Sequence, residues 1–337
     1  METDTKTLKL HPPGLVQALR AGLDTVANNL YLLVLPILLD LILWLGPRLS
    51  LKTLLTPMVE DAIQQLLTAG GTTTNDMMQV IAQLRQVWEQ FLESFNLLSL
   101  ASTFPVGIPS LLSTWAPATN PLGNPMVSDI TTASSAWSIW FVIILVGFLA
   151  GSYYLGAIAR RTLNLQSPYS LGTLGGQTLQ SLVLTIVLIG ILLGVGIPIL
   201  VMTGILAAIS PVLLSPAIFV LGLVCVWIFM PIIFAPHGIF TFRQNALGSI
   251  RTSMQVVNGN RAGVGMFVLS LLVLEQGLRI LWQTPTADSW LLLVGIIGHA
   301  FISTSLLSAS FYYYRDGFRW WQEQTHQSSA DKTPAQS

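Results

Sequence analysis

Four ionisable side chains fall within apolar stretches that are long enough to cross a membrane, and they are the first candidates for chemistry. They are Asp40, Glu275, Arg279 and His299. A charge placed in hydrocarbon is costly, so such residues usually pair with one another or line the path of an ion or a substrate. Glu275 and Arg279 are four residues apart with the acid first, which favours an ion pair along one helix.

Two interpretations of these residues follow. In the first, Arg279 is neutralised by Glu275 or Asp40, and the pairing fixes how the helices pack. In the second, all four side chains meet in one outward-facing polar pocket that serves a substrate or proton pathway. His299 taken alone fits a hydrogen-bonded packing residue. We favour the first interpretation, because a buried charge needs a partner simply to be tolerated.

Catalytic signatures are missing from the sequence. It contains no P-loop, no dinucleotide fingerprint, no H-E-x-x-H, no G-x-S-x-G and no metal-ligand spacing of Cys and His. Glu89 and Glu93 share one face of an expected helix and would suit a cation or an enzyme acting outside the membrane, although we favour a solvated face as their explanation. We therefore predict a protein with no catalytic residue, no cofactor and no bound metal.

The elements that must position these residues are membrane spans. Residues 162–242 contain no Asp, Glu, Lys or Arg, whereas about one residue in four is charged in a soluble protein. One crossing takes about 20 residues, so this run is too long for a single span. The whole chain is 52% hydrophobic and 9% charged, with a mean hydropathy of +0.66. This composition predicts an integral membrane protein in a lipid bilayer and excludes a nucleic-acid binder, which needs a basic face.

Six apolar runs are long enough to span, and they give an all-α transmembrane helix bundle. We place them at residues 30–45, 136–159, 182–202, 213–233, 262–282 and 290–313. The chain then divides into an amphipathic N-terminal segment (1–29), span 1 (30–45), an extracytoplasmic segment (46–135), spans 2 to 6 (136–313) and a disordered cytoplasmic tail (314–337). Within the uncharged run, residues up to about 180 are expected to lie at the interface, and the remainder forms a hairpin.

The basic residues orient this bundle. With both termini in the cytoplasm, 11 of the 15 Lys and Arg residues fall on the inner side, as the positive-inside rule requires. Tryptophans are expected to form aromatic belts at the two membrane surfaces, because an indole ring prefers the headgroup layer. The residues placed in these belts are Trp44, Trp137, Trp140, Trp282 and Trp290 on the outer side, and Trp320 and Trp321 on the inner side.

The long outer segment, residues 46–135, has a net charge of −3 and is expected to be helical in part. Residues 76–95 show the three-and-four spacing of an amphipathic helix, and residues 51–67 show a weaker version of it. Residues 97–112 are apolar but carry Pro105, Gly107 and Pro109. They are too broken to cross, so we expect them to dip into the outer interface or to cover the bundle.

Sequence similarity within the chain suggests a repeated unit. Leu19, Arg20, Leu23, Val26 and Asn29 match residues that lie 231 positions later, and each set leads into a span. The unit would be an interfacial helix followed by a crossing and a return crossing, as in pseudo-symmetric bundles. Small residues four apart let helix backbones approach closely. The chain has two such pairs, Gly147 with Gly151 and Gly190 with Gly194.

Residues 240–282 combine an arginine-bearing amphipathic helix, the turn Val257-Asn258-Gly259-Asn260 and an apolar span, and a later helix closes with Tyr312-Tyr313-Tyr314-Arg315-Asp316. This last third of the chain resembles the membrane portion of glycerophosphodiester phosphodiesterases and related bacterial six-span proteins. The resemblance implies the architecture alone, since catalysis in that family resides in a soluble domain that this sequence lacks.

Three functions are compatible with these features. The first, which we favour, is a non-enzymatic accessory, scaffold or assembly component of the bacterial inner membrane, working with a membrane-protein partner or as a homo-oligomer. The second is a transporter or channel for a small solute or lipid that uses the polar residues of spans 1, 5 and 6. The third is a membrane enzyme that uses outer carboxylates such as Glu89 and Glu93.

Overall fold

Helices make up most of the computed structural model, which describes residues 12–69, 75–114, 117, 119–166 and 169–330. The first elements of the chain are α1 (Leu15–Ala27), η1 (Leu30–Leu33), α2 (Val34–Leu45), β1 (Arg48–Ser50), α3 (Lys52–Ala69), α4 (Asn75–Ser94), η2 (Leu97–Ala101) and β2 (Val127–Asp129). The remaining elements are α5 (Ala133–Leu163), α6 (Leu171–Ile209), α7 (Pro211–Phe229), η3 (Met230–Ile232), α8 (Ala235–Phe242), α9 (Ala246–Gly259), α10 (Arg261–Trp282) and α11 (Leu292–Ala330).

Five helical stretches in the described residues are long and apolar enough to cross a membrane. They are Ala133–Leu163, Leu171–Leu206, Ser215–Phe242, Arg261–Trp282 and Leu292–Thr325, and they correspond to the predicted spans 2 to 6. Predicted span 1 differs, because α2 is short and a bend of 91° separates it from α1. A sixth span exists only if α1 and the 30–45 stretch together count as one broken crossing. The chain is thus an all-α membrane protein with five or six candidate spans.

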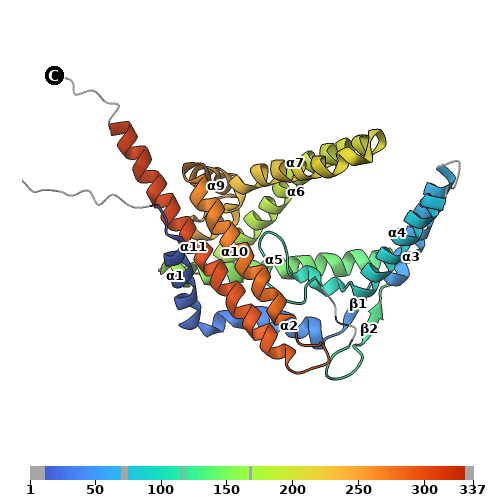
Figure 1. Cartoon of the computed structure of the whole chain (residues 1–337). Coiled ribbons are helices and arrows are strands. Elements are labelled where there is room, and N and C mark those ends of the chain that lie inside the picture. The colour runs from blue at the N-terminus through green and yellow to red at the C-terminus, as the bar shows by residue number, and fades with distance from the viewer. Residues whose placement is uncertain (1–11, 70–74, 115–116, 118, 167–168, 331–337) are drawn as a thin grey trace, which may run out of the picture.

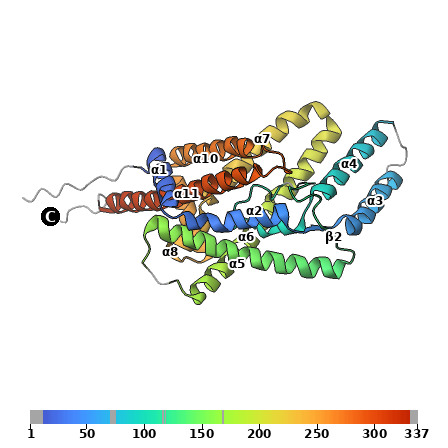
Figure 2. The same cartoon turned by 90° about the horizontal axis from the view of Figure 1, so that it is seen from below.

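A bundle and two projecting hairpins make up the molecule. Helix α11 runs through the bundle and contacts α1, α2, α5 and α10, while α8 and α9 complete it (Figure 1). The α3–α4 hairpin and the outer part of the α6–α7 hairpin both extend away from this bundle, as the second view also shows (Figure 2). The described N-terminal end lies against α11 near Gly317, and α11 continues beyond it to Ala330.

Two predictions about helix ends are wrong. Helix α6 is continuous from Leu171 to Ile209, so residues 171–180 are not a helix separate from the predicted third span. The predicted turn of this hairpin does lie at Ser210, before Pro211. At the C-terminus, α11 continues to Ala330, so most of the expected disordered tail is helical, and residues 331–337 lie outside the described residues. The start of α6 is uncharged and the end of α11 is largely polar, and neither composition interrupts the backbone hydrogen bonds of a helix.

The predicted repeat has a structural counterpart in α1 and α9. Asn29 and Asn260, which lie 231 residues apart, break the helix with nearly the same backbone angles: φ −140°, ψ 57° and φ −145°, ψ 62°. In each case the Asn N–H bonds the carbonyl three residues earlier, at 2.9 and 3.2 Å. The buried faces correspond as well, with Ala18, Gly22 and Val26 in α1 matching Ser249, Ser253 and Val257 in α9.

Candidate functional site

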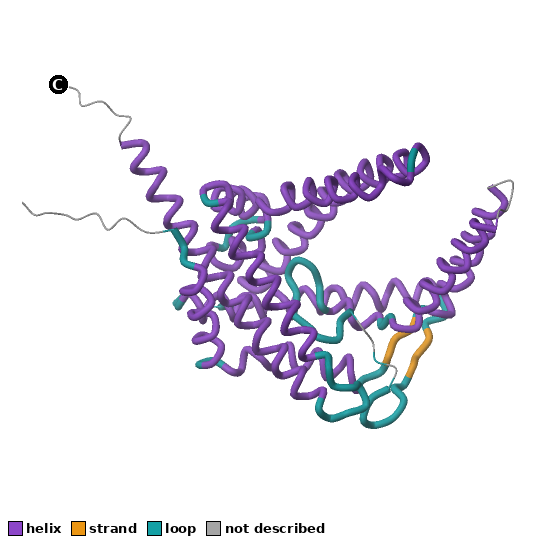
Figure 3. The backbone as a smooth tube through the Cα atoms, viewed as in Figure 1, coloured by secondary structure: helices purple, strands orange, loops and turns teal. Residues whose placement is uncertain are grey.

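A non-helical segment of the outer region enters the bundle beside α5 and creates the candidate site. Figure 3 draws the chain after η2 as a loop that lies against this helix. A methyl group on Gly147 would come within 2.7 Å of the Ala101 carbonyl oxygen, and one on Gly151 within 2.7 Å of the Val106 carbonyl oxygen. Gly151 lies about 16 Å along α5 from Trp140, at 1.5 Å per residue. Measured from Trp140, which the sequence predicts to lie at the outer membrane surface, this length is about half the thickness of a bilayer, which is about 30 Å.

This arrangement confirms that residues 97–112 cover the bundle, and it changes the meaning of the glycine pairs. Gly147 and Gly151 make room for irregular backbone rather than for a second helix. Gly190 and Gly194 have no described atom within 4 Å of an added methyl group. Irregular backbone at membrane depth is tolerated when protein buries it, and here Val106 and Leu111 are fully buried.

Asp40 holds this re-entrant segment in place. Its carboxylate is fully buried and accepts three hydrogen bonds: from the Ser110 hydroxyl at 2.5 Å, from the Leu111 N–H at 3.0 Å and from the Leu112 N–H at 3.1 Å. The carboxylate is positioned by α2, whose neighbouring residues Leu39 and Leu43 face the core. A buried carboxylate that accepts several backbone N–H bonds is a strong structural anchor.

Arg279 of α10 holds the same segment from the other side. Its guanidinium donates to the carbonyl oxygens of Ser110 at 3.2 Å and Leu111 at 3.5 Å, and to the Thr114 hydroxyl at 3.4 Å. The amide of Gln283, one turn later, donates to the Leu111 carbonyl at 3.3 Å. Residues 110–114 are therefore bound through both their N–H groups and their carbonyls, and we call Asp40, Arg279 and Gln283 the loop clamp.

Glu275 and His299 form a separate pair between α10 and α11. The His299 Nε2 lies 3.2 Å from the Glu275 Oε1, and the Ser303 hydroxyl donates to that same carboxylate oxygen at 3.0 Å. His299 is 3% exposed and the Glu275 side chain is 26% exposed. The second ring nitrogen of His299, Nδ1, is buried and has no hydrogen-bond partner within the described part of the protein.

The four predicted residues form their hydrogen bonds in two sets, Asp40 and Arg279 with residues 110–114, and Glu275 with His299. Electrostatic interactions connect the two sets, between Asp40 and His299 and between Glu275 and Arg279. Among the described residues, Arg279 makes no direct salt bridge with Glu275 or Asp40, although its charge does interact with that of Glu275. Its closest hydrogen-bond acceptors are backbone carbonyl oxygens. The sequence could not reveal this, because a carbonyl acceptor carries no side-chain signature and Ser110 lies in a stretch without periodicity.

The outer segment is also fixed where it leaves the bundle. Buried Asn96 accepts hydrogen bonds from the N–H groups of Leu49 and Leu98, both at 3.1 Å, and β1 pairs in parallel with β2.

The Trp44 indole donates to the Ala287 carbonyl at 2.7 Å. Trp44 is 1% exposed, so it is a core residue and not part of the predicted outer aromatic belt. Trp137 is exposed at 67%, as expected for a ring that faces the surrounding medium.

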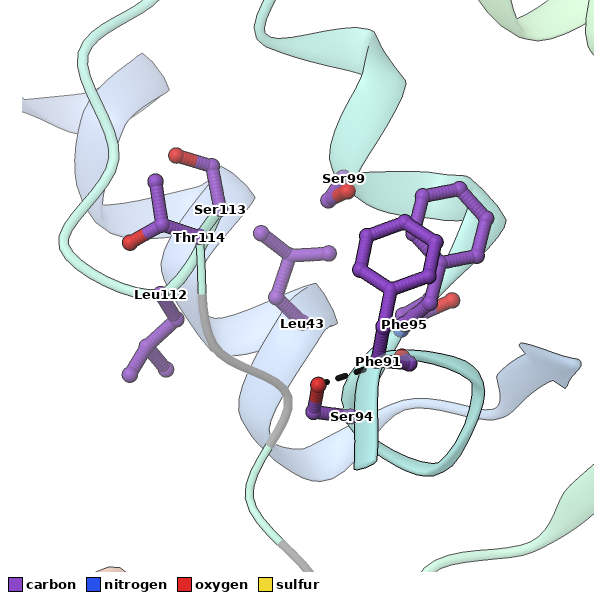
Figure 4. Close-up of a pocket in the computed structure, with 9 residues that line it drawn as sticks. Leu43, Phe91, Ser94, Phe95, Ser99, Leu112, Ser113 and Thr114 are labelled. Carbon is purple, nitrogen blue, oxygen red and sulfur yellow. Dashed lines mark hydrogen bonds between the residues drawn. The ribbon is translucent and has the colours of Figure 1, made fainter. Parts of the chain in front are cut away.

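Where α4 meets the bundle, a small cavity of about 50 Å³ separates the hairpin from residues 112–114 (Figure 4). Phe91 of α4 and Phe95, which follows this helix, lie on one side of it, with Leu43 of α2 and residues 112–114 opposite. Ligand pockets usually measure at least about 300 Å³, so this space suits a few water molecules at most. It marks the joint between the projecting hairpin and the bundle.

Two ion pairs tie the helices of the projecting hairpin together. Arg85 of α4 contacts both carboxylate oxygens of Glu60 in α3, at 2.9 and 2.7 Å. Lys52 at the start of α3 contacts Glu93 near the end of α4 at 2.8 Å. The hydrogen bond from Lys52 holds the pKa of Glu93 below its usual value. Glu93 is thus engaged with a lysine, which argues against the metal or catalytic role considered for Glu89 and Glu93.

In comparisons with known proteins, no family model matches this chain, and no curated protein or solved structure shows significant similarity to it. The resemblance of the last third to the membrane portion of glycerophosphodiester phosphodiesterases therefore stays a prediction.

Proposed function

We propose that this protein is a non-enzymatic scaffold of the bacterial inner membrane, which holds its outer helical hairpin in a fixed place for a partner protein. One observation carries the proposal: the charged side chains of Asp40 and Arg279, which lie in the predicted spans, both form hydrogen bonds with the re-entrant segment that precedes residue 115. A pathway residue must instead be able to exchange its partners during transport. The costliest polar groups in the spans thus serve to fix the outer segment.

The hairpin that this segment positions has the surface of a docking element. Helices α3 and α4 contact each other and project from the bundle (Figure 1). Their exposed apolar side chains include Met58, Val87, Trp88 and Phe91, with exposed fractions of 62%, 61%, 38% and 46%. Aromatic and Met side chains are enriched at protein interfaces. We infer that the partner is another protein that meets this face outside the membrane.

Site-specific photo-crosslinking in native membranes tests the scaffold role. A photoreactive residue at Val87 on the hairpin is expected to give an adduct of one defined mass. The same residue at Leu200 on α6, which is 74% exposed, serves as the control and should give lipid or no adduct. Asp40→Asn, which weakens the clamp, is expected to lower the yield at Val87 several-fold. A Val87 adduct that is absent, or that does not respond to Asp40→Asn, contradicts the proposal.

A second candidate function, transport, is favoured by the pair of Glu275 and His299. Both groups can exchange a proton, and Glu275 remains partly exposed. Reconstitution into proteoliposomes separates the two functions. If the protein carries a proton-coupled flux that Glu275→Gln abolishes and Ser303→Ala leaves measurable, transport replaces the scaffold role.

A further inference from the structure

A larger cavity lies at the end of the bundle away from the outer segment, where α5 ends and α6 begins. It has a volume of about 280 Å³. This is the end at which arginines flank the uncharged run, so the positive-inside rule places it at the cytoplasmic headgroup level. The lining residues that matter here are Arg160, Tyr169, Thr173, Gln177, Thr241 and Arg243.

The cavity is positively charged. Arg160 and Arg243 both line it, and none of the described residues around it is acidic. The Arg160 guanidinium lies 4.9 Å from the centre of the Tyr169 ring, and its Nη1 is buried without a hydrogen-bond partner among the described residues. Burial raises the pKa of Tyr169 to about 12, so the phenol stays neutral and does not balance the charge. A buried guanidinium nitrogen without an acceptor calls for an anion.

A second, independent feature is an unsatisfied amide. Gln177 is 7% exposed, yet its Oε1 is buried without a described partner, and so is the Thr241 hydroxyl. A buried carbonyl oxygen left unpaired costs about 1–3 kcal/mol. This acceptor therefore suits a ligand that carries an O–H or N–H group close to its anionic group.

The first turn of α6 adds a third contribution. Ser170 caps this helix by accepting the Thr173 N–H at 3.2 Å, and Thr173 lines the cavity one turn before Gln177. The partial positive charge at a helix N-terminus favours an anion in front of it. Helix α5 makes space at this place through Gly156, where a methyl group would come within 2.7 Å of the Tyr169 hydroxyl.

We propose that this cavity binds a phosphate ester, with the phosphate between Arg160 and Arg243 and a hydroxyl or amine of the esterified group donating to Gln177. The planar guanidinium of an arginine can donate two parallel hydrogen bonds to two oxygens of one phosphate, whereas a lysine acts as a point charge. The volume is close to the lower limit for ligand pockets and suits a glycerophosphate-sized group. Such a group is offered both by a phospholipid headgroup at this membrane level and by a soluble phosphate ester. The inference does not depend on the scaffold role.

Binding to the purified, delipidated full-length protein in detergent tests the proposal. The probes are dioleoylphosphatidylglycerol, glycerol 3-phosphate and, as a control without phosphate, dioleoylglycerol. Retained adducts are counted by native mass spectrometry, and the shift in thermal unfolding is measured for each probe. Saturable binding of phosphatidylglycerol alone identifies a lipid site, and saturable binding of glycerol 3-phosphate identifies a soluble ester. Both results support the cavity as a phosphate site.

Arg161 provides the matched control. It is adjacent to Arg160, but its guanidinium binds the Tyr31 hydroxyl at 2.5 Å and does not line the cavity. Arg160→Gln is expected to weaken phosphate-probe binding at least tenfold, and Arg161→Gln less than twofold. Gln177→Leu is expected to weaken it at least threefold and serves as the test if Arg160→Gln fails to fold. Equal losses in the two arginine variants, equal binding of dioleoylglycerol, or no binding of either phosphate probe overturns the proposal.

Discussion

Removing the Asp40 carboxylate should release the re-entrant segment. Asp40→Ala leaves three buried donors without their carboxylate acceptor, on Ser110, Leu111 and Leu112. The Leu112 N–H keeps a second acceptor, the Ser110 hydroxyl at 3.2 Å. The other two donors have no second acceptor in the described part of the chain, and the segment is too deep for water to replace the carboxylate freely.

The size of the effect follows from the number of bonds. At the average found for hydrogen bonds between membrane helices, about 0.6 kcal/mol each, the loss is about 2 kcal/mol. At about 1.5 kcal/mol, the lower value for a bond to a charged group, the same three bonds give about 5 kcal/mol. We therefore expect Asp40→Ala to destabilise the protein by about 2–5 kcal/mol. Asp40→Asn keeps one acceptor oxygen and should lose about half as much.

Thermal unfolding in detergent, followed by labelling of the single cysteine Cys225, measures this loss. Limited proteolysis at Arg48, Lys52 and Arg85 in the outer segment should accelerate in the same variant. Asp24→Ala is the matched control, because Asp24 pairs with Arg20 on the surface and should change stability by less than about 0.5 kcal/mol. If Asp40→Ala is as stable and as protease-resistant as Asp24→Ala, the loop clamp does not hold the segment.

Three further outcomes are expected. Gly151→Ala should cost about 1–3 kcal/mol in thermal unfolding through overpacking, whereas Gly194→Ala, which meets open space, should be neutral or stabilising; equal effects would contradict the glycine assignment. Asn96→Ala leaves two N–H donors unpaired and should cost about 1–3 kcal/mol, with faster hydrogen exchange at β1; unchanged exchange there argues against the role of Asn96. The pKa of Glu93 is lowered by Lys52, so its stabilisation of the α3–α4 hairpin is present above the carboxyl's unfolded pKa and is lost as pH falls through the folded one. Hydrogen exchange in α4 should therefore rise, after correction for intrinsic rates, between pH 6 and pH 3 at low salt, and Glu93→Gln should remove the difference.

Much of the fold follows from the sequence because it depends on composition and period. The uncharged run 162–242 requires lipid-facing helices, and runs of about 20 apolar residues locate five candidate spans, although three of these helices extend well beyond the predicted ends. The match of residues 19–29 with the chain 231 positions later predicts a repeated unit, and the structure has the same backbone break at Asn29 and Asn260. The fate of span 1 depends on the fold, because the 91° bend between α1 and the 30–45 stretch is fixed by what α1 packs against.

The arrangement of the polar residues was decided by the tertiary structure alone. Sequence spacing predicts that Glu275 can pair with Arg279, since both lie on one helix, but it cannot weigh this against contacts with a segment far away in the chain. Arg279 donates to the carbonyl oxygens of Ser110 and Leu111 because the re-entrant segment is buried and its backbone must be satisfied without water. The sequence thus determined which groups needed partners in the membrane, and only the fold determined that Arg279 donates its hydrogen bonds to residues 110–114, largely to backbone carbonyl oxygens.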